Sequence, residues 1–350
     1  MKVIKLNIAE FRGIKGCEKP IEFSKFNVLI GRNNTGKSAI LEALFLFPNP
    51  EDSVLGYSKL HFVRDLLHSG ESLTYGYWGD AKIQYTFEYY WDDYPLLCEY
   101  EIVIGERIIS RLSNFKKVKS DDKKDTEKFS EEEFVKILNE AIRRWDETKK
   151  EIKEKIEKSE NTTFLIPSNI SLIKTFDNKI SSERNKLMKQ GSHVKVAKLI
   201  SKCVEDEFTE IYLDTMKLRK KLPDENAFYI HLDDLGDGIK KAVRVMLLLE
   251  AVKPKIVLWD DFEIFAHPSL IETLLKWLTE EEWQVVLSTH SIDVLYALLN
   301  IKHREDVTII QLAKTANDVL TFEKLTLDDL EDLIMANQDP RKVVDLLALR

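Results

Sequence analysis

The chain has 350 residues, of which 44% are hydrophobic and 32% are charged, a composition that excludes disordered and collagen-like proteins. Its length allows one or two domains. With 52 basic and 60 acidic residues the formal net charge is -8, which excludes nucleic-acid binding through an overall positive charge but allows a local basic patch.

Cysteine spacing and hydropathy favour a reduced, intracellular environment. Cys17, Cys98 and Cys203 lie far apart and form no CxxC pair, which favours free thiols over disulfides or a zinc site. The first residues lack the apolar run of a secretory signal, and no stretch reaches the ~18 apolar residues of a membrane helix. We therefore expect a cytoplasmic protein that does not enter a membrane.

The first part of the chain begins an α/β unit. Residues 3–8 alternate between apolar and polar side chains and predict a strand, and residues 27–30 predict a short buried strand. A helix is expected to begin near Lys37 and to end before Pro48, because proline cannot continue a helix.

The middle of the chain has a mixed pattern. Residues 81–115 are rich in aromatic and β-branched side chains, which predicts antiparallel strands. Residues 116–128 predict a loop and 131–157 an amphipathic helix with a solvated lysine and glutamate face. A short strand is expected at 164–167, and 181–221 predict mostly helix.

The C-terminal part alternates strands with helices, which is typical of a mostly parallel sheet. The expected strands are 227–232, 255–260, 284–288, 307–312 and 319–325, and the expected helices are 239–252, 270–278 and 292–299. We therefore predict an α/β fold built from residues 1–80 and 226–325. A mixed β and helical insertion at 81–225 interrupts it, and a helical tail follows at 326–350.

Residues 31–38 match the pattern G-x-x-x-x-G-K-[ST] at every fixed position, between an apolar strand and a helix. Its glycines let backbone N–H groups turn toward phosphate oxygens, Lys37 reaches the terminal phosphates, and the Ser38 hydroxyl binds Mg²⁺. We therefore expect nucleotide binding by Gly31, Arg32, Asn33, Asn34, Thr35, Gly36, Lys37 and Ser38.

Polar residues follow two of the expected buried strands. The first strand brings Asp260 to the carboxyl edge of the sheet, where it can hold Mg²⁺ together with Ser38. Asp261 can orient or deprotonate the attacking water, and His290 at the end of the next strand would face the terminal phosphate. Taken alone, each of these residues could equally serve a turn or a purely structural role.

Two further patterns allow alternative interpretations. Ser288, His290 and Asp293 have the residue types of a hydrolase triad, but they lie too close in sequence and lack a nucleophile elbow. Leu235-Gly236-Asp237-Gly238 precedes a helix, so it is either a tight turn or a bare helix N-terminus that can cap a phosphate.

In this order, the motifs resemble those of ABC-type ATPases of the RecF/SMC/OLD class, in the compact AAA form without a TOPRIM nuclease. Residues 31–38 resemble the Walker A motif of that class, 235–238 its reduced signature, 256–268 its Walker B motif and D-loop, and 285–291 its switch histidine. The likeness implies a P-loop NTPase head with a mixed or parallel sheet, an antiparallel β subdomain and a helical insertion.

The resemblance also implies a Mg²⁺-dependent ATPase that works as a homodimer. Two ATP molecules would lie between the two copies, each held by one Walker A motif and capped by the other copy's Gly236, Asp237 and Gly238. Arg12 would lie near the nucleotide. Because Asp261 replaces the usual catalytic glutamate and Gly236 the usual serine, we expect slow turnover, with Glu263 as an assisting acid.

For the biological role we hypothesise that ATP closes the dimer and couples it to DNA maintenance, repair or defence. The basic clusters at 116–124 and 217–221 are either solvated faces, which the interspersed acids favour, or phosphate contacts. The alternative is a nucleotide-gated switch with negligible hydrolysis that signals to a partner protein through residues 81–225. A transporter ATPase fits less well, because the serine-containing signature is missing.

Overall fold

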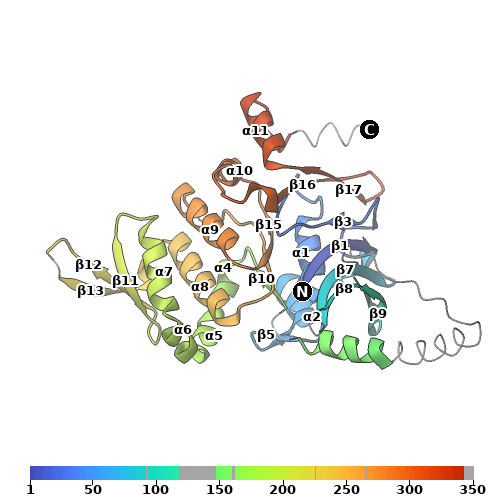
Figure 1. The fold of residues 1–350 in the computed structure, drawn as a ribbon, viewed down its shortest axis with the longest axis horizontal. Coiled ribbons are helices and arrows are strands. Elements are labelled where there is room, and N and C mark those ends of the chain that lie inside the picture. Colours follow the sequence, from blue (N-terminus) through green and yellow to red (C-terminus); the bar gives the residue numbers. More distant parts are fainter. Residues whose placement is uncertain (92–93, 118–146, 160–161, 225, 265, 343–350) are drawn as a thin grey trace, which may run out of the picture.

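The chain folds around a seven-stranded, mainly parallel sheet (Figure 1). The computed structural model describes residues 1–91, 94–117, 147–159, 162–224, 226–264 and 266–342. Strands β10, β14, β15, β4 and β16 run parallel, β17 is antiparallel to β16, and β2 runs parallel to β17. Their bounds are β10 Thr163–Ile166, β14 Ile256–Trp259, β15 Gln284–Ser288, β4 Phe26–Gly31, β16 Val307–Lys314, β17 Val319–Leu325 and β2 Gly16–Cys17.

One face of this sheet is covered by helix α1 (Lys37–Leu46), which also packs against a second, antiparallel sheet. Because α1 lies between two sheets, almost all its residues are buried and it has no polar face. The second sheet has the order β3-β1-β7-β8-β9. Its strands are β3 Ile21–Glu22, β1 Lys2–Ala9, β7 Ala81–Trp91, β8 Tyr94–Ile104 and β9 Ile108–Lys117.

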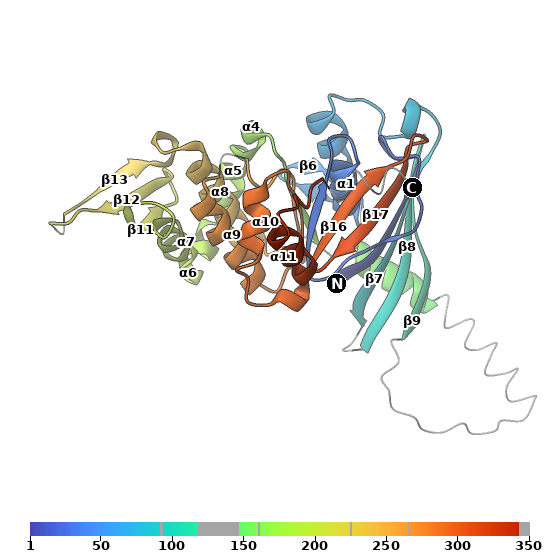
Figure 2. The same ribbon diagram turned by 90° about the horizontal axis from the view of Figure 1, so that it is seen from above.

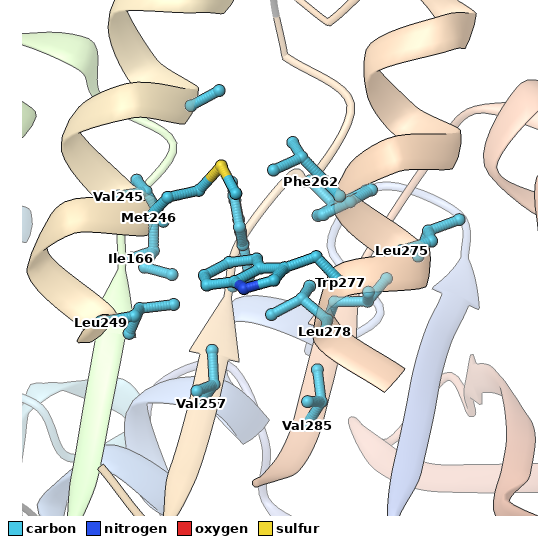
Figure 3. Close-up of a cluster of buried hydrophobic side chains, with 14 of the residues drawn as sticks. Ile166, Val245, Met246, Leu249, Val257, Phe262, Leu275, Trp277, Leu278 and Val285 are labelled. Carbon is cyan, nitrogen blue, oxygen red and sulfur yellow. The ribbon is translucent and has the colours of Figure 1, made fainter. Parts of the chain in front are cut away.

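The other face of the seven-stranded sheet is covered by helices (Figure 3). Val245, Met246 and Leu249 lie above Val257 of β14, with Trp277 beside them. Strands buried between two layers are apolar on both faces, which explains the continuous apolar sequences of β14 and β15. The helices of this layer are α8 Asp237–Val252, α9 Pro268–Glu280 and α10 Ile292–Leu298.

A lobe made of short helices and a three-stranded antiparallel sheet forms the end of the molecule opposite the five-stranded sheet (Figures 1 and 2). The sheet has the order β11-β12-β13, and α7 packs against it. The lobe contains α4 Ile170–Ile173, α5 Phe176–Ser182, α6 Arg184–Gln190, α7 Ser192–Ser201, β11 Glu207–Tyr212, β12 Lys217–Lys221 and β13 Ala227–His231.

Shorter elements complete the fold. Residues 147–157 are helical, and Ile152 and Ile156 of this segment join the core around α1. The remaining elements are β5 Ser53–Val54, β6 Tyr57–Ser58, α2 Lys59–His61, a π-helical turn Phe62–Leu67, 3-10 turns at Tyr75–Tyr77, Leu232–Asp234 and Arg304–Asp306, and α11 Leu327–Met335.

The predicted α/β class, with a mainly parallel sheet and an antiparallel β unit, is confirmed. Two local predictions are wrong. Residues 181–221 are not mostly helical, because β11 and β12 occupy their second half, and the strand at 227–231 pairs with β12 instead of joining the large sheet. Most of the helix expected at 131–157 lies outside the described residues.

The predicted domain boundaries stay a prediction. The pairing of β1 with β7 joins segments on both sides of the boundary placed at residue 80. Within the described ranges, no helix combines the length and the apolar character needed to span a membrane.

Candidate nucleotide-binding site

The loop between β4 and α1 has a backbone that only glycine tolerates at two positions. Gly31 has φ +154° and Gly36 has φ +99°, values that side chains disfavour. A Cβ atom at Gly31 would lie 2.6 Å from the Leu312 carbonyl oxygen, and one at Gly36 would lie 2.9 Å from Cδ1 of Ile14. Close packing and backbone conformation therefore both require these two glycines.

The loop leads directly into the positive end of α1. Gly36 is the N-cap and supplies no capping side chain, so the first backbone N–H groups of α1 are left for another partner. Lys37 lies across the loop, where its Nζ donates to the carbonyl oxygens of Gly31 at 3.0 Å and Arg32 at 2.9 Å. Burial lowers the pKa of Lys37, and the nearby Asp261, Asp260 and Glu263 oppose this shift.

Ser38 and Asp260, far apart in sequence, meet below the loop. The Ser38 hydroxyl donates to the Asp260 carboxylate, with distances of 3.0 and 3.2 Å to its two oxygens. Asp260 follows β14 directly, and its backbone N–H donates to the Ile166 carbonyl oxygen of the neighbouring strand β10 at 2.9 Å. Ser288, the last residue of β15, donates to the same carboxylate at 2.7 Å.

The residues present fit the Mg²⁺ and phosphate groups that the motifs imply. A hydroxyl and a carboxylate oxygen are ligands that Mg²⁺ accepts, and it usually takes its remaining ligands from phosphates and water. Consistent with this, the described part of the chain contains no cluster of three or more His, Cys, Asp or Glu side chains that could hold a metal ion by itself. The glycine loop and the uncapped N-terminus of α1 provide a cradle for an anion.

Asp261 stands next to this pair in an unusual backbone conformation. Its φ is +46°, and its backbone N–H donates to the Ser288 hydroxyl at 2.8 Å. Burial raises the pKa of Asp261, the neighbouring Asp260 and Glu263 raise it further, and His290 and Lys37 oppose the shift. A carboxylate with a raised pKa is better suited to accept a proton than an ordinary surface aspartate.

Glu263 is held by the segment that carries His290. Its carboxylate accepts a hydrogen bond from the Thr289 hydroxyl at 2.7 Å and from the His290 backbone N–H at 2.8 Å. The His290 carbonyl oxygen in turn accepts from Arg341 at 2.8 Å. Glu263 and Arg341 therefore fix the backbone of His290, whose side chain is exposed.

Arg12 forms an ion pair with Glu42 of α1, a residue that belongs to no recognised motif. Its Nε lies 3.1 Å from Oε2 of Glu42, and His68 lies 2.8 Å from the other oxygen of the same carboxylate. These three side chains line a cavity of about 230 Å³ together with Ser38, Asp260 and Asn169. Glu42 lies one helical turn beyond Ser38, and only that spacing could have pointed to it.

Lys241, on α8, is a buried cation that belongs to no sequence motif. The residue is 3% exposed, its Nζ lies 5.7 Å from the centre of the Trp259 ring, and that atom has no hydrogen-bond partner among the described residues. Burial lowers its pKa to about 8, while Asp261, Glu263 and Asp260 oppose this shift. The ammonium group is therefore buried within electrostatic reach of the acidic cluster.

The signature-like residues lie apart from the phosphate loop of the same chain. Gly236 caps the N-terminus of α8 without a side chain, and Asp237 pairs with Lys240 at 3.1 Å. Gly236, Asp237 and Gly238 border a cavity of about 340 Å³ whose other lining residues are Ile200, Cys203, Val204, Ile239, His267 and Leu270. No residue of the phosphate loop lines that cavity.

The structure thus brings Lys37, Ser38, Asp260, Asp261, Glu263 and the His290 segment into one cluster, with Arg12 on its flank. It does not bring Gly236, Asp237 and Gly238 into that cluster. Asn34, at φ +62°, takes a left-handed conformation that asparagine tolerates well. The hydrolase triad is not formed as such, because Ser288 is bound to Asp260.

Comparisons with known proteins agree with this architecture. The chain is 34% identical over 77 residues to the uncharacterized protein MJECL11 of Methanocaldococcus jannaschii, an alignment that covers 21% of this chain and 68% of that protein. Among solved structures, it is similar to the SMC head domain from Thermotoga maritima, with a TM-score of 0.52, 15% identity and coverage of 93% of this chain and 99% of that one.

Two further solved structures are SMC heads in complexes. An SMC head bound to the C-terminal winged-helix domain of ScpA gives a TM-score of 0.58 at 14% identity, covering 94% of this chain and 99% of that chain. The Pyrococcus furiosus SMC head with an extended coiled coil, bound to the C-terminal domain of ScpA, gives 0.54 at 11% identity, covering 96% and 99%. Identities this low establish the fold alone.

A family profile identifies the chain more specifically than these structures do. The profile of the family described as "AAA domain, putative AbiEii toxin, Type IV TA system" matches residues 26–295, from the strand before the phosphate loop to the helix after His290. Its motifs and its SMC-head fold confirm the resemblance to the RecF/SMC class. The chain therefore belongs to this AAA-domain family of ABC-type ATPases, with the P-loop fold of an SMC head.

Proposed function

We propose that this protein binds ATP with Mg²⁺ and hydrolyses it slowly between two copies of the chain. The observation that carries the proposal is the meeting of Ser38 with Asp260 directly below the loop that Gly31 and Gly36 shape. These residues lie 222 positions apart in the sequence, and their arrangement suits a metal-bound triphosphate. Membership of an ATPase family supports the same activity.

Each residue has a distinct role in this proposal. Lys37 and the backbone N–H groups of the loop bind the phosphates, while Ser38 and Asp260 hold Mg²⁺, which would neutralise developing charge on the phosphate oxygens. Asp261 accepts a proton from water as the water oxygen forms a bond to the γ-phosphorus and the bond to the leaving ADP oxygen breaks. His290 faces the terminal phosphate, and Glu263 positions the His290 backbone.

We propose a homodimer because one chain does not complete the site. Gly236, Asp237 and Gly238 border a cavity that excludes the phosphate loop, so within one chain they are not placed to cap its nucleotide. The uncapped N-terminus of α8 is available to a phosphate held by a second copy. Arg12, fixed by Glu42, is proposed to contact the nucleotide from the side.

The dimer cycle is proposed to act in DNA maintenance, repair or defence, in line with the RecF/SMC class. The SMC heads in two of the similar structures bind ScpA, which makes a protein partner for residues 81–225 of this chain a further part of the proposal. Neither role is specified by the nucleotide site itself.

A nucleotide-gated switch with negligible hydrolysis is the second candidate function. Glu263, which could assist Asp261, already accepts two hydrogen bonds from the Thr289 and His290 segment. The shorter Asp261 is then the free base, and a small error in its position would slow hydrolysis strongly. ATP would still close the dimer and signal its presence to a partner.

Two substitutions test the proposal. Lys37→Ala should abolish the heat of ATP binding in calorimetry, whereas Lys276→Ala, which removes an exposed lysine on α9, should leave it unchanged. Asp261→Asn should bind ATP but release phosphate at least about a hundredfold more slowly in a single turnover. Unchanged ATP affinity in Lys37→Ala would contradict the site, and wild-type protein that binds ATP but never releases phosphate would identify the switch.

A further inference from the structure

The three-stranded sheet lies at the far end of the lobe (Figures 1 and 2). Its strand register places basic and aromatic side chains together on one face. Residues paired directly across antiparallel strands share a face of the sheet. The register pairs Lys217 with Tyr212 of β11, and Arg219 with Tyr229 of β13. Lys221 lies two residues beyond Arg219 and therefore on the same face.

The opposite face of this sheet belongs to the protein core. Phe208, Ile211 and Leu218 are buried there, and the Phe208 backbone N–H donates to the Ser201 hydroxyl of α7 at 2.6 Å. On the outer face, in contrast, Tyr212 and Tyr229 each remain 49% exposed. The outer face is therefore not needed to hold the lobe together.

The two tyrosines lean toward each other over the central strand. Their ring centroids lie 6.4 Å apart with an interplanar angle of 64°, an edge-to-face arrangement. Lys217 and Arg219 are two residues apart on β12, and each is paired with one of the tyrosines. Aromatic surface and positive charge therefore lie next to each other on this face. Exposed aromatic rings on a sheet are the surfaces on which unpaired nucleic-acid bases stack.

The charges on this face are only loosely compensated. The Lys217 side chain makes no hydrogen bond or ion pair with any residue that the structure describes, although its backbone pairs with both neighbouring strands. Arg219 and Lys221 have their carboxylate partners, Glu210 and Glu207, at 3.9 Å each. Three cations against two carboxylates leave this face with one net positive charge on a chain whose net charge is -8. Glu210 also accepts a hydrogen bond from the Tyr229 hydroxyl at 3.0 Å, so a phosphate that contacts Arg219 has to displace this carboxylate.

We propose that the face formed by Tyr212, Lys217, Arg219, Lys221 and Tyr229 binds single-stranded nucleic acid. Bases stack on the two tyrosines, and backbone phosphates contact the three cations. A duplex keeps its bases stacked inside and offers this face only phosphates. The inference gives a chemical basis to the DNA coupling in the proposed function and rests on that part of it, but it does not depend on ATP hydrolysis.

Fluorescence anisotropy of the full-length chain without nucleotide tests the proposal. The probes are fluorescein-labelled DNA and RNA single strands of about 30 nucleotides, and a duplex of the same sequence. We expect a single strand to bind more tightly than the duplex. The affinity for the single strand should fall as the salt concentration rises from about 50 to 200 mM. Tyr212→Ala with Tyr229→Ala should weaken binding about tenfold or more, and Lys217→Ala with Arg219→Ala should also reduce the salt dependence.

Matched controls come from the same sheet. Phe228 is 45% exposed and pairs with Lys220, so both lie on the opposite face, and Phe228→Ala and Lys220→Ala should bind like wild type. The proposal is overturned if neither single strand binds at low salt, or if Phe228→Ala weakens binding as much as loss of the tyrosines. Comparing the affinities for the DNA and RNA single strands shows which of the two the face prefers. The ATPase proposal is tested separately, by the heat of ATP binding, so a negative result in either experiment leaves the other proposal standing.

Discussion

Lys241 is a buried cation within electrostatic reach of the carboxylates of the nucleotide site. Its Nζ lies against the Trp259 ring without a hydrogen-bond partner among the described residues. Burying such a charge destabilises the fold unless another electrostatic interaction compensates for it. The carboxylates of Asp260, Asp261 and Glu263 provide that interaction, because they stabilise the charged form of Lys241 against the effect of burial. The interaction is reciprocal, so Lys241 also favours the ionised form of Asp261.

The pH dependence of turnover should reveal this coupling. Because Asp261 acts on Lys241 electrostatically and the interaction is mutual, loss of the positive charge in Lys241→Met should raise the pKa of Asp261. The acidic limb of the kcat profile should then move to higher pH. Methionine has a similar volume and leaves no buried charge, so the fold should tolerate it. The measurement is phosphate release between about pH 5 and 9. Lys241→Arg keeps the charge and should keep the wild-type limb, and an unmoved limb in Lys241→Met would rule out the coupling.

Sequence patterns predicted the motif residues of the site but not the neighbouring residues that bond to them and fix their positions. Ser38 and Asp260 were predicted to meet, because carboxyl ends of parallel strands and the following loops share one edge of a sheet. Glu42 and His68 were not foreseen, since their contact with Arg12 depends on how the segment 59–68 folds back onto α1. The engagement of Glu263 by Thr289 likewise depends on the approach of two loops.

At the scale of elements, sequence patterns predicted the strands that are fully buried in the large sheet. They failed for the strands of the lobe, where few residues are buried. Strands β4, β14 and β15 are buried on both faces, so their apolar sequences were clear. Residues 207–221 contain many lysines, arginines and glutamates, which favour helices. Only a few residues, such as Phe208, Ile211 and Leu218, face a core, and a β-bulge between Phe208 and Glu210 breaks the two-residue period of β11. Pairing between β11 and β12 overrides the helix preference of this segment.

The start of α1 offers a prediction at this scale. Gly36→Ala forces a side chain into φ +99° and brings its Cβ within 2.9 Å of Ile14, so we expect a loss of about 1–3 kcal/mol in the free energy of unfolding and weaker ATP binding. Gly16→Ala is the control, because a Cβ there meets nothing within 4 Å. Urea denaturation and calorimetry measure the two effects, and equal stability of the two variants would show that the loop relaxes.

At the scale of the whole molecule, the two halves of the proposed site lie in separate places. The phosphate loop and Asp260 form one cluster, and Gly236, Asp237 and Gly238 border another cavity. A Cβ atom at Gly236 meets nothing within 4 Å, and its φ of -64° is open to any residue. A large side chain at this position should therefore leave the chain folded and obstruct only a second copy.

Mixing two inactive variants tests whether the site is shared between chains. Gly236→Arg should fold, bind ATP like wild type and fail to dimerise in light scattering, because the arginine blocks the surface that would cap the partner's phosphate. Lys37→Ala should not bind ATP, yet its Gly236 region is intact. A mixed dimer then contains one complete site, formed by the phosphate loop of the first variant and the signature of the second.

Phosphate release should therefore reappear when the two variants are mixed, although each alone is inactive. The mixed dimer carries the obstructing arginine only at the site that lacks Lys37, so the complete site is free of the clash. If that clash still prevents pairing, Gly236→Ala, which adds a single methyl group, replaces the arginine variant and should reduce turnover without abolishing dimerisation. A Gly236→Arg protein that hydrolyses ATP like wild type by itself would show that each chain works alone.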